Sequence, residues 1–393
     1  MAIAAVPDYM GTDFHDASPG LRFSYFLSVW TDDGQWRLDA QQRLNAFRPI
    51  LTLTPSDKKR MSALAERQSA QASAVPTAAL LTLEARAVAP FTTGLGNEHP
   101  LENGFAFLNP YGLPYLPGSG VKGVLRRAAE ELANGEWGDT FGWTAAKVEE
   151  LFGHQGDDNG EEADAWRGAL QFWDVYPQLA GDQLTVEIMT PHQGHYLQGG
   201  ETPHDSGGPN PILFLAVPPQ SVFSFNVRCD EVRLSESLRE GNAWKALMAD
   251  AFEHAFEWLG FGAKTAVGYG NLARDMDLEQ DRTERQEKAR NQARLDALSP
   301  EERAEEEART KALELIDGVR KRLAQDQQNN LKEAGGELAQ RRLRLLEEAL
   351  TWESAELRQQ AVEVLNETVR WLPWPKKRAK ACKADMARLR GEG

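Results

Sequence analysis

Glycines spaced for phosphate binding mark the most informative segment of the chain. The residues from Gly118 to Gly123 read Gly-Ser-Gly-Val-Lys-Gly and satisfy the dinucleotide-binding pattern G-x-G-x-x-G. That pattern binds a dinucleotide where a strand runs straight into the glycines and a second strand follows the helix. Here Pro114 and Pro117 interrupt the approach, and the residues after the helix, NGEWGDTFGW, do not resemble a strand. A P-loop is excluded as well, because no Gly-Lys-Ser or Gly-Lys-Thr occurs in the segment.

The same residues suit another anion, the phosphate of a polymer. Ser119 is placed to cap a helix whose N-terminal N–H groups and positive dipole end attract negative charge. Lys122 and Arg126, four residues apart, share one face of that helix, and Arg127 flanks it. Together with Gly118, where a backbone can pass closely, these residues form a phosphate-contact set without base-reading character. A tight turn into an ordinary helix with solvated cations explains them equally, so both interpretations stay open.

A second glycine-rich segment, GFGAKTAVGYG (260–270), contains a cation, a hydroxyl group and a phenol. Lys264, Thr265 and Tyr269 supply these groups, and glycines such as Gly262 let a polymer approach main-chain amides. A packing loop between a helix and a closing strand is the alternative. Two such segments in one domain favour the binding interpretation.

Histidines gather in a third segment, MTPHQGHYLQGGETPHD. Its potential metal ligands are His192, His195, His204 and Asp205. Histidine pairs are common metal ligands, but a loop with prolines and glycines imposes no coordination geometry on them. The alternative is a structured insertion that meets RNA or a neighbouring subunit, where His195 and Tyr196 would stack on bases. We predict no bound metal and no other cofactor.

Composition describes a globular chain with a strong negative charge. The 393 residues are 41% hydrophobic and 26% charged, with a formal net charge of −15. That charge argues against non-specific binding of nucleic acid over the whole surface, but it does not exclude a local basic groove. The two cysteines form no motif, no apolar run is long enough to span a membrane, and the N-terminus has no basic region typical of a signal peptide. We therefore expect a cytoplasmic protein.

Apolar periodicity predicts the elements that position these residues. Residues 80–90 alternate apolar and polar side chains like a strand, and residues 119–133 carry an apolar stripe at helical spacing. Four more strand-like runs follow: 169–177, 183–190, 211–217 and 221–228. A helix over 242–260 and a short closing strand complete the order. This order is typical of an α+β fold with a ferredoxin-like (RRM-like) core and insertions.

Two segments flank that core, which we place at residues 76–276. Residues 1–75 are predicted to form a helical or mixed segment that packs on the core. Residues 277–393 form a charged helical extension, in which Ser299, Pro300 and Glu302 have the pattern of a capped helix start. The extension either stabilises the core, docks neighbouring subunits, or touches RNA through its basic end. The cations of that end are Lys376, Lys377, Arg378 and Lys380.

Taken together, these motifs resemble the RAMP superfamily of CRISPR-associated proteins. PYLPGSGVKGVLRRA is similar to the family's proline-glycine-serine-x-x-lysine-glycine motif, and GFGAKTAVGYG to the glycine-rich loop near the end of its core. More narrowly, residues 94–123 and 173–225 resemble the family of sixth subunits of the type III-B (Cmr) effector complex. The resemblance covers roughly residues 77–275.

The resemblance implies a ferredoxin-like RAMP core and a role in RNA-guided antiviral defence. A sixth subunit caps one end of the effector near the 3′ region of the guide, so the implied partners are CRISPR guide RNA, target RNA and other type III-B subunits, with no membrane. Sequence specificity would belong to base pairing. The positions that would grip or line the RNA are Gly118, Ser119, Lys122, Arg126, Arg127, Gly262 and Lys264.

The resemblance also argues against catalysis. Related subunits that cut RNA carry an aspartate after the first strand, whereas PFTTGLGNEHPLENG holds Glu98, His99 and Glu102 but no aspartate. Two alternatives stay open. One is an RNA endonuclease of the same superfamily that uses Glu98 or the histidines as general acid and base. The other is a metal-dependent enzyme built on the cluster of His192, His195 and His204.

Overall fold

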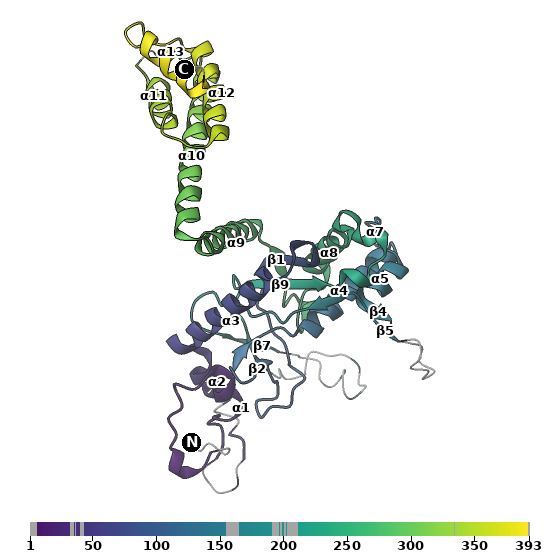
Figure 1. Cartoon of the computed structure of the whole chain (residues 1–393). Coiled ribbons are helices and arrows are strands. Elements are labelled where there is room, and N and C mark those ends of the chain that lie inside the picture. The colour runs from purple at the N-terminus through teal and green to yellow at the C-terminus, as the bar shows by residue number, and fades with distance from the viewer. Residues whose placement is uncertain are drawn as a thin grey trace. The chain divides into compact units, whose positions relative to one another are not determined.

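The computed structural model describes residues 6–31, 35, 37–39, 43–154, 165–190, 196, 199, 202, 211–333 and 335–391. The chain forms two compact units, Met1–Thr283 and Glu284–Gly393. Figure 1 shows the first with its sheet and surrounding helices, and the second as a set of helices. Each unit has its own cluster of buried apolar side chains.

The first unit is built on a four-stranded antiparallel sheet in the order β10-β1-β9-β6. Its strands are β1 (Leu80–Ala87), β6 (Leu170–Phe172), β9 (Val222–Cys229) and β10 (Leu272–Arg274). Helix α4 (Gly118–Ala133) separates β1 from β6 in sequence, and α8 (Ala243–His254) with the π-helical turn Ala255–Leu259 separates β9 from β10. Mixed α and β structure around an antiparallel sheet therefore agrees with the α+β prediction.

The two faces of the sheet differ in polarity, as the alternation in the sequence predicts. Leu83 and Ala85 of β1 are buried and pair with Phe225 and Phe223 of β9. The ring of Phe225 packs on Phe252 of α8, with centroids 5.3 Å apart. Side chains two residues apart on a strand share a face, so one face of the sheet is apolar and covered by helix.

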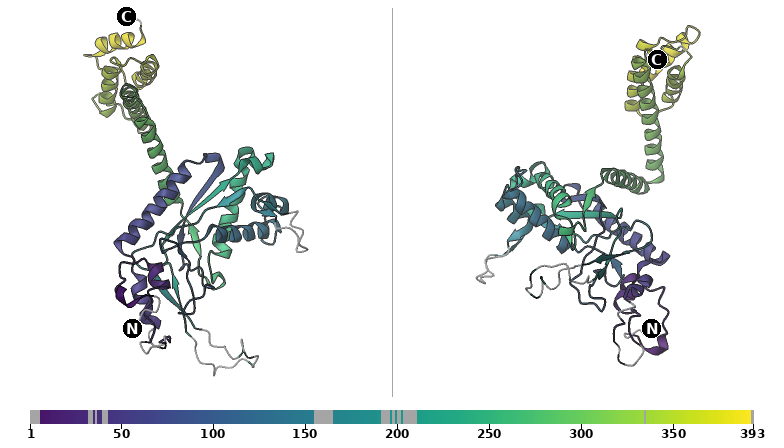
Figure 2. Two further views of the ribbon diagram at one scale, coloured as in Figure 1. Left: turned by 60° about the horizontal axis from the view of Figure 1, so that its bottom comes forward. Right: turned by 180° about the vertical axis from the view of Figure 1, so that it is seen from behind.

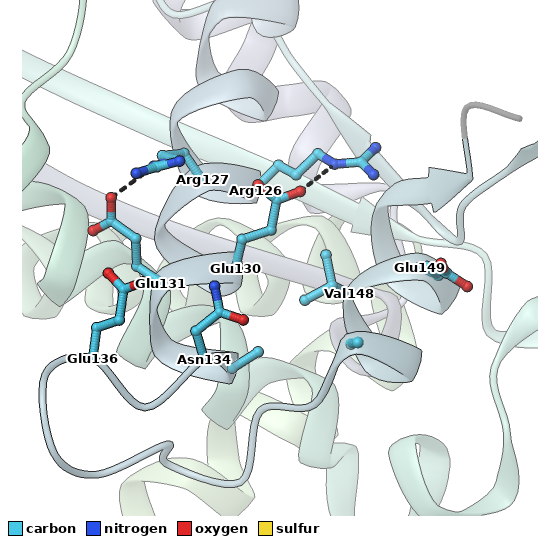
Figure 3. Close-up of a pocket in the computed structure, with 10 residues that line it drawn as sticks. Arg126, Arg127, Glu130, Glu131, Asn134, Glu136, Val148 and Glu149 are labelled. Atoms are coloured by element: carbon cyan, nitrogen blue, oxygen red, sulfur yellow. Dashed lines mark hydrogen bonds and ion pairs between the residues drawn. The ribbon is translucent and has the colours of Figure 1, made fainter. Parts of the chain in front are cut away.

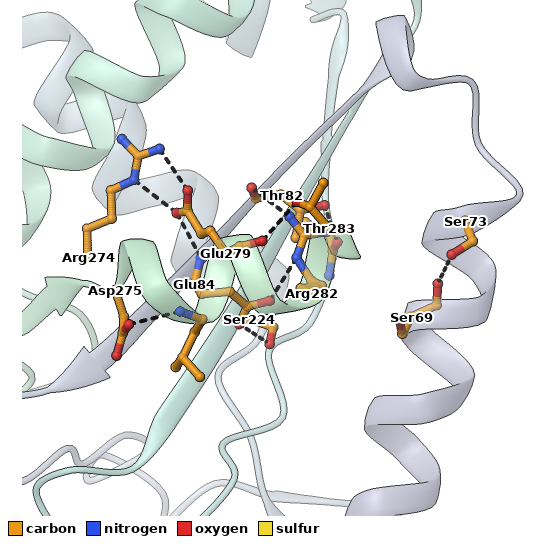
Figure 4. A network of polar contacts seen from close by, with 12 residues as sticks. Ser69, Ser73, Thr82, Glu84, Ser224, Arg274, Asp275, Glu279, Arg282 and Thr283 are labelled. Carbon is orange, nitrogen blue, oxygen red and sulfur yellow. Dashed lines mark hydrogen bonds and ion pairs between the residues drawn. The ribbon is translucent and has the colours of Figure 1, made fainter. Parts of the chain in front are cut away.

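The opposite face is polar and is held by the first turns of α9 (Met276–Asp296). Buried Glu84 accepts a hydrogen bond from Ser224 Oγ at 2.6 Å and pairs with Arg282 at 3.1 Å (Figure 4). Glu279 of the same helix pairs with Arg274 of β10 at 2.9 Å. These contacts explain why the first unit extends to Thr283, several residues beyond the end of the last strand.

The N-terminal segment adds helices to the same core. They are η1 (Asp8–Met10), α1 (Pro19–Ser24), α2 (Arg43–Leu51) and α3 (Pro55–Ser73). Helix α3 begins with a capping box, in which Thr54 Oγ1 accepts from the Asp57 N–H and the Asp57 carboxylate accepts from the Thr54 N–H. Buried Phe23 and Phe47 belong to the same apolar cluster as the sheet, so this segment packs on the core. Figure 2 gives two further views of these helices.

Short elements interrupt the core between its main strands. They are β2 (Phe107–Leu108), β3 (Leu113–Pro114), α5 (Ala145–Phe152), β4 (Gly153–His154), β5 (Trp166–Arg167), β7 (Thr185–Met189), β8 (Ile212–Ala216) and α7 (Glu236–Arg239). The predicted runs 183–190 and 211–217 do form strands, but β7 and β8 pair only with each other. The predicted strand over 169–177 ends at Phe172, because the following residues form isolated bridges, such as Val175 with Leu116.

The second unit consists of helices around a separate core. They are α10 (Pro300–Gln328), α11 (Glu337–Ala349), α12 (Ala355–Trp371) and α13 (Ala379–Arg390). The predicted start of α10 is confirmed: Ser299 and Glu302 form a capping box, and Pro300 is the first helical residue. Arg342 is fully buried in this core, 4.3 Å from the ring centroid of Trp374, and donates to the carbonyl of Pro373.

Candidate nucleic-acid interface

The N-terminal turn of α4 is fixed by contacts with the chain that follows β6. A Cβ atom at Gly118 would lie 2.3 Å from the carbonyl oxygen of Phe172, so this position requires glycine. The Gly118 N–H donates to Asp174 Oδ1 at 2.7 Å. The expected cap at Ser119 is wrong: Pro117 is the N-cap residue, and Ser119 is an exposed residue inside the helix. Asp174 therefore satisfies a helix N–H group, as a capping side chain does elsewhere.

The other two glycines of the motif have no such packing role. A Cβ atom at Gly123 would meet nothing within 4 Å, and one at Gly120 would meet only Leu116 Cδ1, at 3.3 Å. Both glycines are exposed on the first two turns of the helix. Because glycine has no side chain, the helix backbone around Lys122 is uncovered, and an extended ligand can approach it closely.

Gly118→Ala and Gly123→Ala are expected to change stability in opposite directions. The first variant forces a methyl group against the Phe172 carbonyl, and overpacking of this kind costs about 1–3 kcal/mol. The second places a good helix former in open space, which stabilises a helix interior by about 0.5–1 kcal/mol. Denaturant unfolding of both variants measures these changes. A Gly118→Ala protein as stable as the parent would show that the contact with Phe172 is not tight.

Three cations form a cluster next to this turn, which we call the cationic cluster: Lys122, Arg126 and Arg167. Burial, and then the charges of Arg126 and Arg167, lower the pKa of Lys122. Arg126 pairs with Glu130 at 2.9 Å. Within the described part of the chain, neither Lys122 nor Arg167 has a carboxylate partner at ion-pair distance. The cluster thus has an excess of positive charge that a bound phosphate would neutralise.

Arg127 was expected to flank this set, but its side chain leaves α4 in another direction (Figure 3). Its Nε donates to Glu131 Oε1 at 2.7 Å, and Glu131 Oε2 lies 2.9 Å from Nε2 of buried His254. Arg127 is therefore a member of an internal network that ties α4 to α8. Its exposed guanidinium already has a carboxylate partner, whereas Lys122 has none among the residues that the structure describes.

A cavity of about 270 Å³ between α4 and α5 marks where the positive surface ends. Its charged lining residues are Arg126, Arg127, Glu130, Glu131, Glu136 and Glu149. Each arginine is paired with a glutamate, so carboxylates are in excess here. The cavity is unsuited to an anion, and a nucleic acid would be confined to the first turns of α4.

Trp166 stands beside Arg167 on the β4–β5 hairpin and was not anticipated from the sequence. Its ring is 49% exposed and stacks on His154, with centroids 4.6 Å apart and an interplanar angle of 20°. The hairpin base is tight, because a Cβ atom at Gly168 would lie 2.4 Å from the Gly153 nitrogen. Trp166 and Arg167 are consecutive on β5, so their side chains leave the hairpin on opposite faces. Exposed aromatic rings and clustered cations are both features of proteins that bind single-stranded nucleic acid.

The second glycine-rich segment packs on the β7–β8 hairpin. Lys264 adopts the left-handed conformation with φ of 59°, and its Nζ lies 5.3 Å from the ring centroid of Phe214 and 3.4 Å from Met189 Sδ. A Cβ atom at Gly262 would lie 2.3 Å from the Thr92 carbonyl oxygen. Close packing therefore explains Gly262, and Lys264 remains half-buried against the hairpin. No hydrogen bond or ion pair between described residues links this segment to the cationic cluster.

Tyr269 anchors the same segment and gives a pH prediction. Burial and the hydrogen bond to Glu187 raise the pKa of Tyr269 to about 12. An unfolded tyrosine ionises at about 10. The neutral phenol therefore contributes stability at pH values below about 10, and this contribution is lost as the pH rises through 12. The measurement is the tyrosinate absorbance of the parent protein minus that of Tyr269→Phe during a pH titration. This difference should rise at a higher pH than the absorbance of the exposed tyrosines. A rise at the same pH would show that Tyr269 is not held by Glu187.

The residues after β1 that were considered for catalysis have structural roles or no partner. His99 stacks on Phe23 at 3.7 Å, its Nδ1 accepts from the Leu101 N–H, and its Nε2 donates to the Phe23 carbonyl. Burial lowers its pKa. Glu102 pairs with Arg43, and Glu98 is exposed. These three residues are not arranged as a general acid and base.

The histidine segment falls mostly in a part of the chain that the structure does not describe. His192, His195, His204 and Asp205 lie outside the described residues, so their binding to metal, RNA or protein stays a prediction. Tyr196 is described and is 48% exposed. Among the residues that the structure describes, no group of three potential ligands is placed to hold a metal ion. Likewise, none of the described helices is long and apolar enough to cross a membrane.

Comparison with known proteins points to one superfamily. Residues 84–273 match the RAMP superfamily. The chain is 30% identical over 228 residues to "CRISPR system Cmr subunit Cmr6" of Pyrococcus furiosus, with coverage of 46% of this chain and 63% of the relative. It is 30% identical over 147 residues to the Cmr6 subunit of Saccharolobus solfataricus, with coverage of 37% and 43%. The chain thus spans less than two thirds of the length of either relative.

Solved structures give weaker likenesses. A chain in the cryo-EM structure of the type III-B Cmr-β complex bound to cognate target RNA is 19% identical, with a TM-score of 0.41 and coverage of 59% of this chain and 71% of that chain. The crystal structure of Cmr6 from Pyrococcus furiosus is 25% identical, with a TM-score of 0.28 and coverage of 51% and 100%. Residues 84–273, which hold most of the sheet and both glycine-rich segments, are thus similar to the RAMP superfamily, and part of the chain is 30% identical to subunits named Cmr6.

Proposed function

We propose that this protein is a non-catalytic RNA-binding subunit of a type III-B CRISPR effector complex. The observation that carries the proposal is the cationic cluster, in which two cations have no carboxylate partner among the described residues, together with the exposed ring of Trp166 on the hairpin that carries Arg167. Its members lie within the residues that match the RAMP superfamily. The relatives named as Cmr6 subunits support the assignment to a Cmr complex.

The topology supports a ferredoxin-like core for this subunit. The strands and helices follow the order β-α-β-β-α-β, and the sheet order β10-β1-β9-β6 places the first strand between the third and the fourth. RNA-binding modules of this architecture are common. Helix α4 of this core holds Lys122 and Arg126, and the inserted β4–β5 hairpin carries Arg167 and Trp166.

We further propose that the subunit caps one end of the complex and grips the 3′ region of the guide RNA. The net charge of −15 fits a member of an assembly, because a protein that found RNA alone would benefit from a broad positive field. Lys122 and Arg167 would contact phosphates, and Trp166 would stack on an unpaired base. The sequence of the target would be read by base pairing rather than by these side chains.

A role without catalysis is supported by the residues after β1. An endonuclease of the same superfamily would need a general base there, but both ring nitrogens of His99 are engaged in hydrogen bonds. Replacing His99 would therefore disturb packing on Phe23 rather than chemistry. The alternative of a metal-dependent enzyme still depends on His192, His195 and His204.

The experiment that tests the proposal is to purify the tagged protein from its native cells and sequence the nucleic acid that accompanies it. The expected result is short RNAs with one constant, repeat-derived 5′ end and variable spacer sequences, together with the other effector subunits. Cleavage of RNA by the purified chain alone, abolished by His192→Ala, would instead favour the endonuclease. An intact, folded preparation with no RNA or with random fragments would contradict the proposal.

A further inference from the structure

A pair of exposed tryptophans lies on the side of α4 and α8 where Arg127 is tied to Glu131. Trp137 is 48% exposed and Trp258 is 55% exposed, and their ring centroids are 4.5 Å apart. We call these two rings the tryptophan patch. Large exposed aromatic side chains that touch one another are unusual on a protein surface without a partner, and tryptophan is a preferred residue at interface centres.

Buried side chains hold the rings of the tryptophan patch in place. The buried ring of His254 meets Trp137 edge to face, with centroids 5.3 Å apart. Its Nε2 lies 2.9 Å from Glu131, which also accepts from Arg127. Trp258 belongs to the π-helical turn Ala255–Leu259, and such turns often occur at functional sites. Rings fixed in advance lose little conformational entropy when a partner binds.

Acidic side chains belong to the same helix and loop as the patch. Asp250 and His254 are four residues apart and share one face of α8, and Trp258 follows them in the π-helical turn. Burial, and then the charge of Asp139, raise the pKa of Asp250, which places Asp139 of the α4–α5 loop near that face. In the described part of the chain, no cation pairs with Asp139 or Asp250. Glu136, next to Trp137, lies beside Glu131 in Figure 3.

The charge decides the kind of ligand. Phosphates would be repelled by Asp139 and Asp250, so the patch does not extend the RNA surface. A lysine or arginine side chain would gain from both features, since tryptophan is the strongest aromatic partner of a cation and the carboxylates add attraction. A second copy of this chain is a poor occupant, because each copy carries a net charge of −15.

We propose that the tryptophan patch docks a segment of a partner protein that combines basic with apolar side chains. The apolar side chains would cover the rings, and the cations would meet Asp139 and Asp250. This inference does not rest on RNA binding by the cationic cluster. The two surfaces use different residues and attract ligands of opposite charge.

A labelled peptide of alternating arginine and leucine, titrated against the full chain, tests the proposal by fluorescence anisotropy. Trp258→Ser is expected to weaken binding at least about tenfold, as is typical of the loss of an interface hot spot. Asp139→Lys with Asp250→Lys should weaken it to a similar extent. Tyr25→Ser is the matched control: that aromatic residue is 57% exposed and belongs to the N-terminal segment, so peptide binding should not change.

Three outcomes would overturn the proposal. The first is an arginine–serine peptide of equal charge that binds as tightly as the arginine–leucine peptide, because attraction would then be only electrostatic. The second is an equal effect of Trp258→Ser and Tyr25→Ser in proteins with unchanged circular dichroism. The third is displacement of the peptide by single-stranded oligouridylate, or by a peptide of residues 370–390 of this chain, because RNA or the chain's own basic end would then be the occupant.

Discussion

The double variant Lys122→Glu, Arg167→Glu is expected to bind single-stranded RNA about 100-fold more weakly than the parent protein. Each charged hydrogen bond to a phosphate contributes about 1.5 kcal/mol or more, and two lost contacts amount to about two powers of ten in affinity. The same two contacts release counterions from RNA. The slope of log K against log salt should therefore fall in magnitude by about 1.4, at about 0.7 for each phosphate of a single strand.

A matched control separates a lost site from a change in net charge. Lys321 and Arg344 lie in the second unit, are 76% and 71% exposed, and form ion pairs with neighbours on their own helices. Lys321→Glu with Arg344→Glu changes the charge by the same amount, so its affinity for RNA should fall much less and its salt slope should not change. Equal losses in the two double variants, or an unaltered slope for Lys122→Glu, Arg167→Glu, would remove the cationic cluster from the RNA surface.

Local signals in the sequence predicted the elements well. The apolar stripe of residues 119–133 is the buried side of α4, and the pattern around Ser299 is the capping box of α10. Both depend on residues within one helix, where spacing determines which side chains meet. The cap of α4 could not be predicted in this way, because Asp174 reaches Gly118 from the chain after β6, 56 residues further on.

The site could be predicted only in part, for a similar reason. The glycine motif indicated Lys122 and Arg126, whose helical spacing places them on one face. Arg167 joins them through a hairpin whose strands are two residues long, too short for any alternation to be visible. Tertiary contacts also gave His99 a packing role that its neighbours in sequence do not reveal. The Trp-Arg pair that follows the acidic segment was the one available signal for Trp166 and Arg167.

Trp166→Ala is expected to lower the affinity for single-stranded RNA by about 5- to 100-fold without changing the salt slope. Stacking of a base on an aromatic ring contributes about 1–3 kcal/mol, and it releases no counterions. The unchanged slope therefore distinguishes stacking by Trp166 from phosphate contact by its neighbour Arg167. Trp166→Phe should recover most of the affinity, because a smaller ring still offers a face to the base. The measurement is RNA binding at several salt concentrations.

The ring has a second possible role, which the same variants address. Trp166 stacks on His154, so its loss could loosen the β4–β5 hairpin and displace Arg167 from Lys122. Displacement of Arg167 would remove one phosphate contact, and the salt slope would then fall in magnitude by about 0.7, half of the change expected for the charge-reversed protein. Trp258→Ala is the matched control, because that tryptophan is 55% exposed and lies among carboxylates. A reduced slope for Trp166→Ala, or an equal loss of affinity in Trp258→Ala, would show that Trp166 does not stack on RNA.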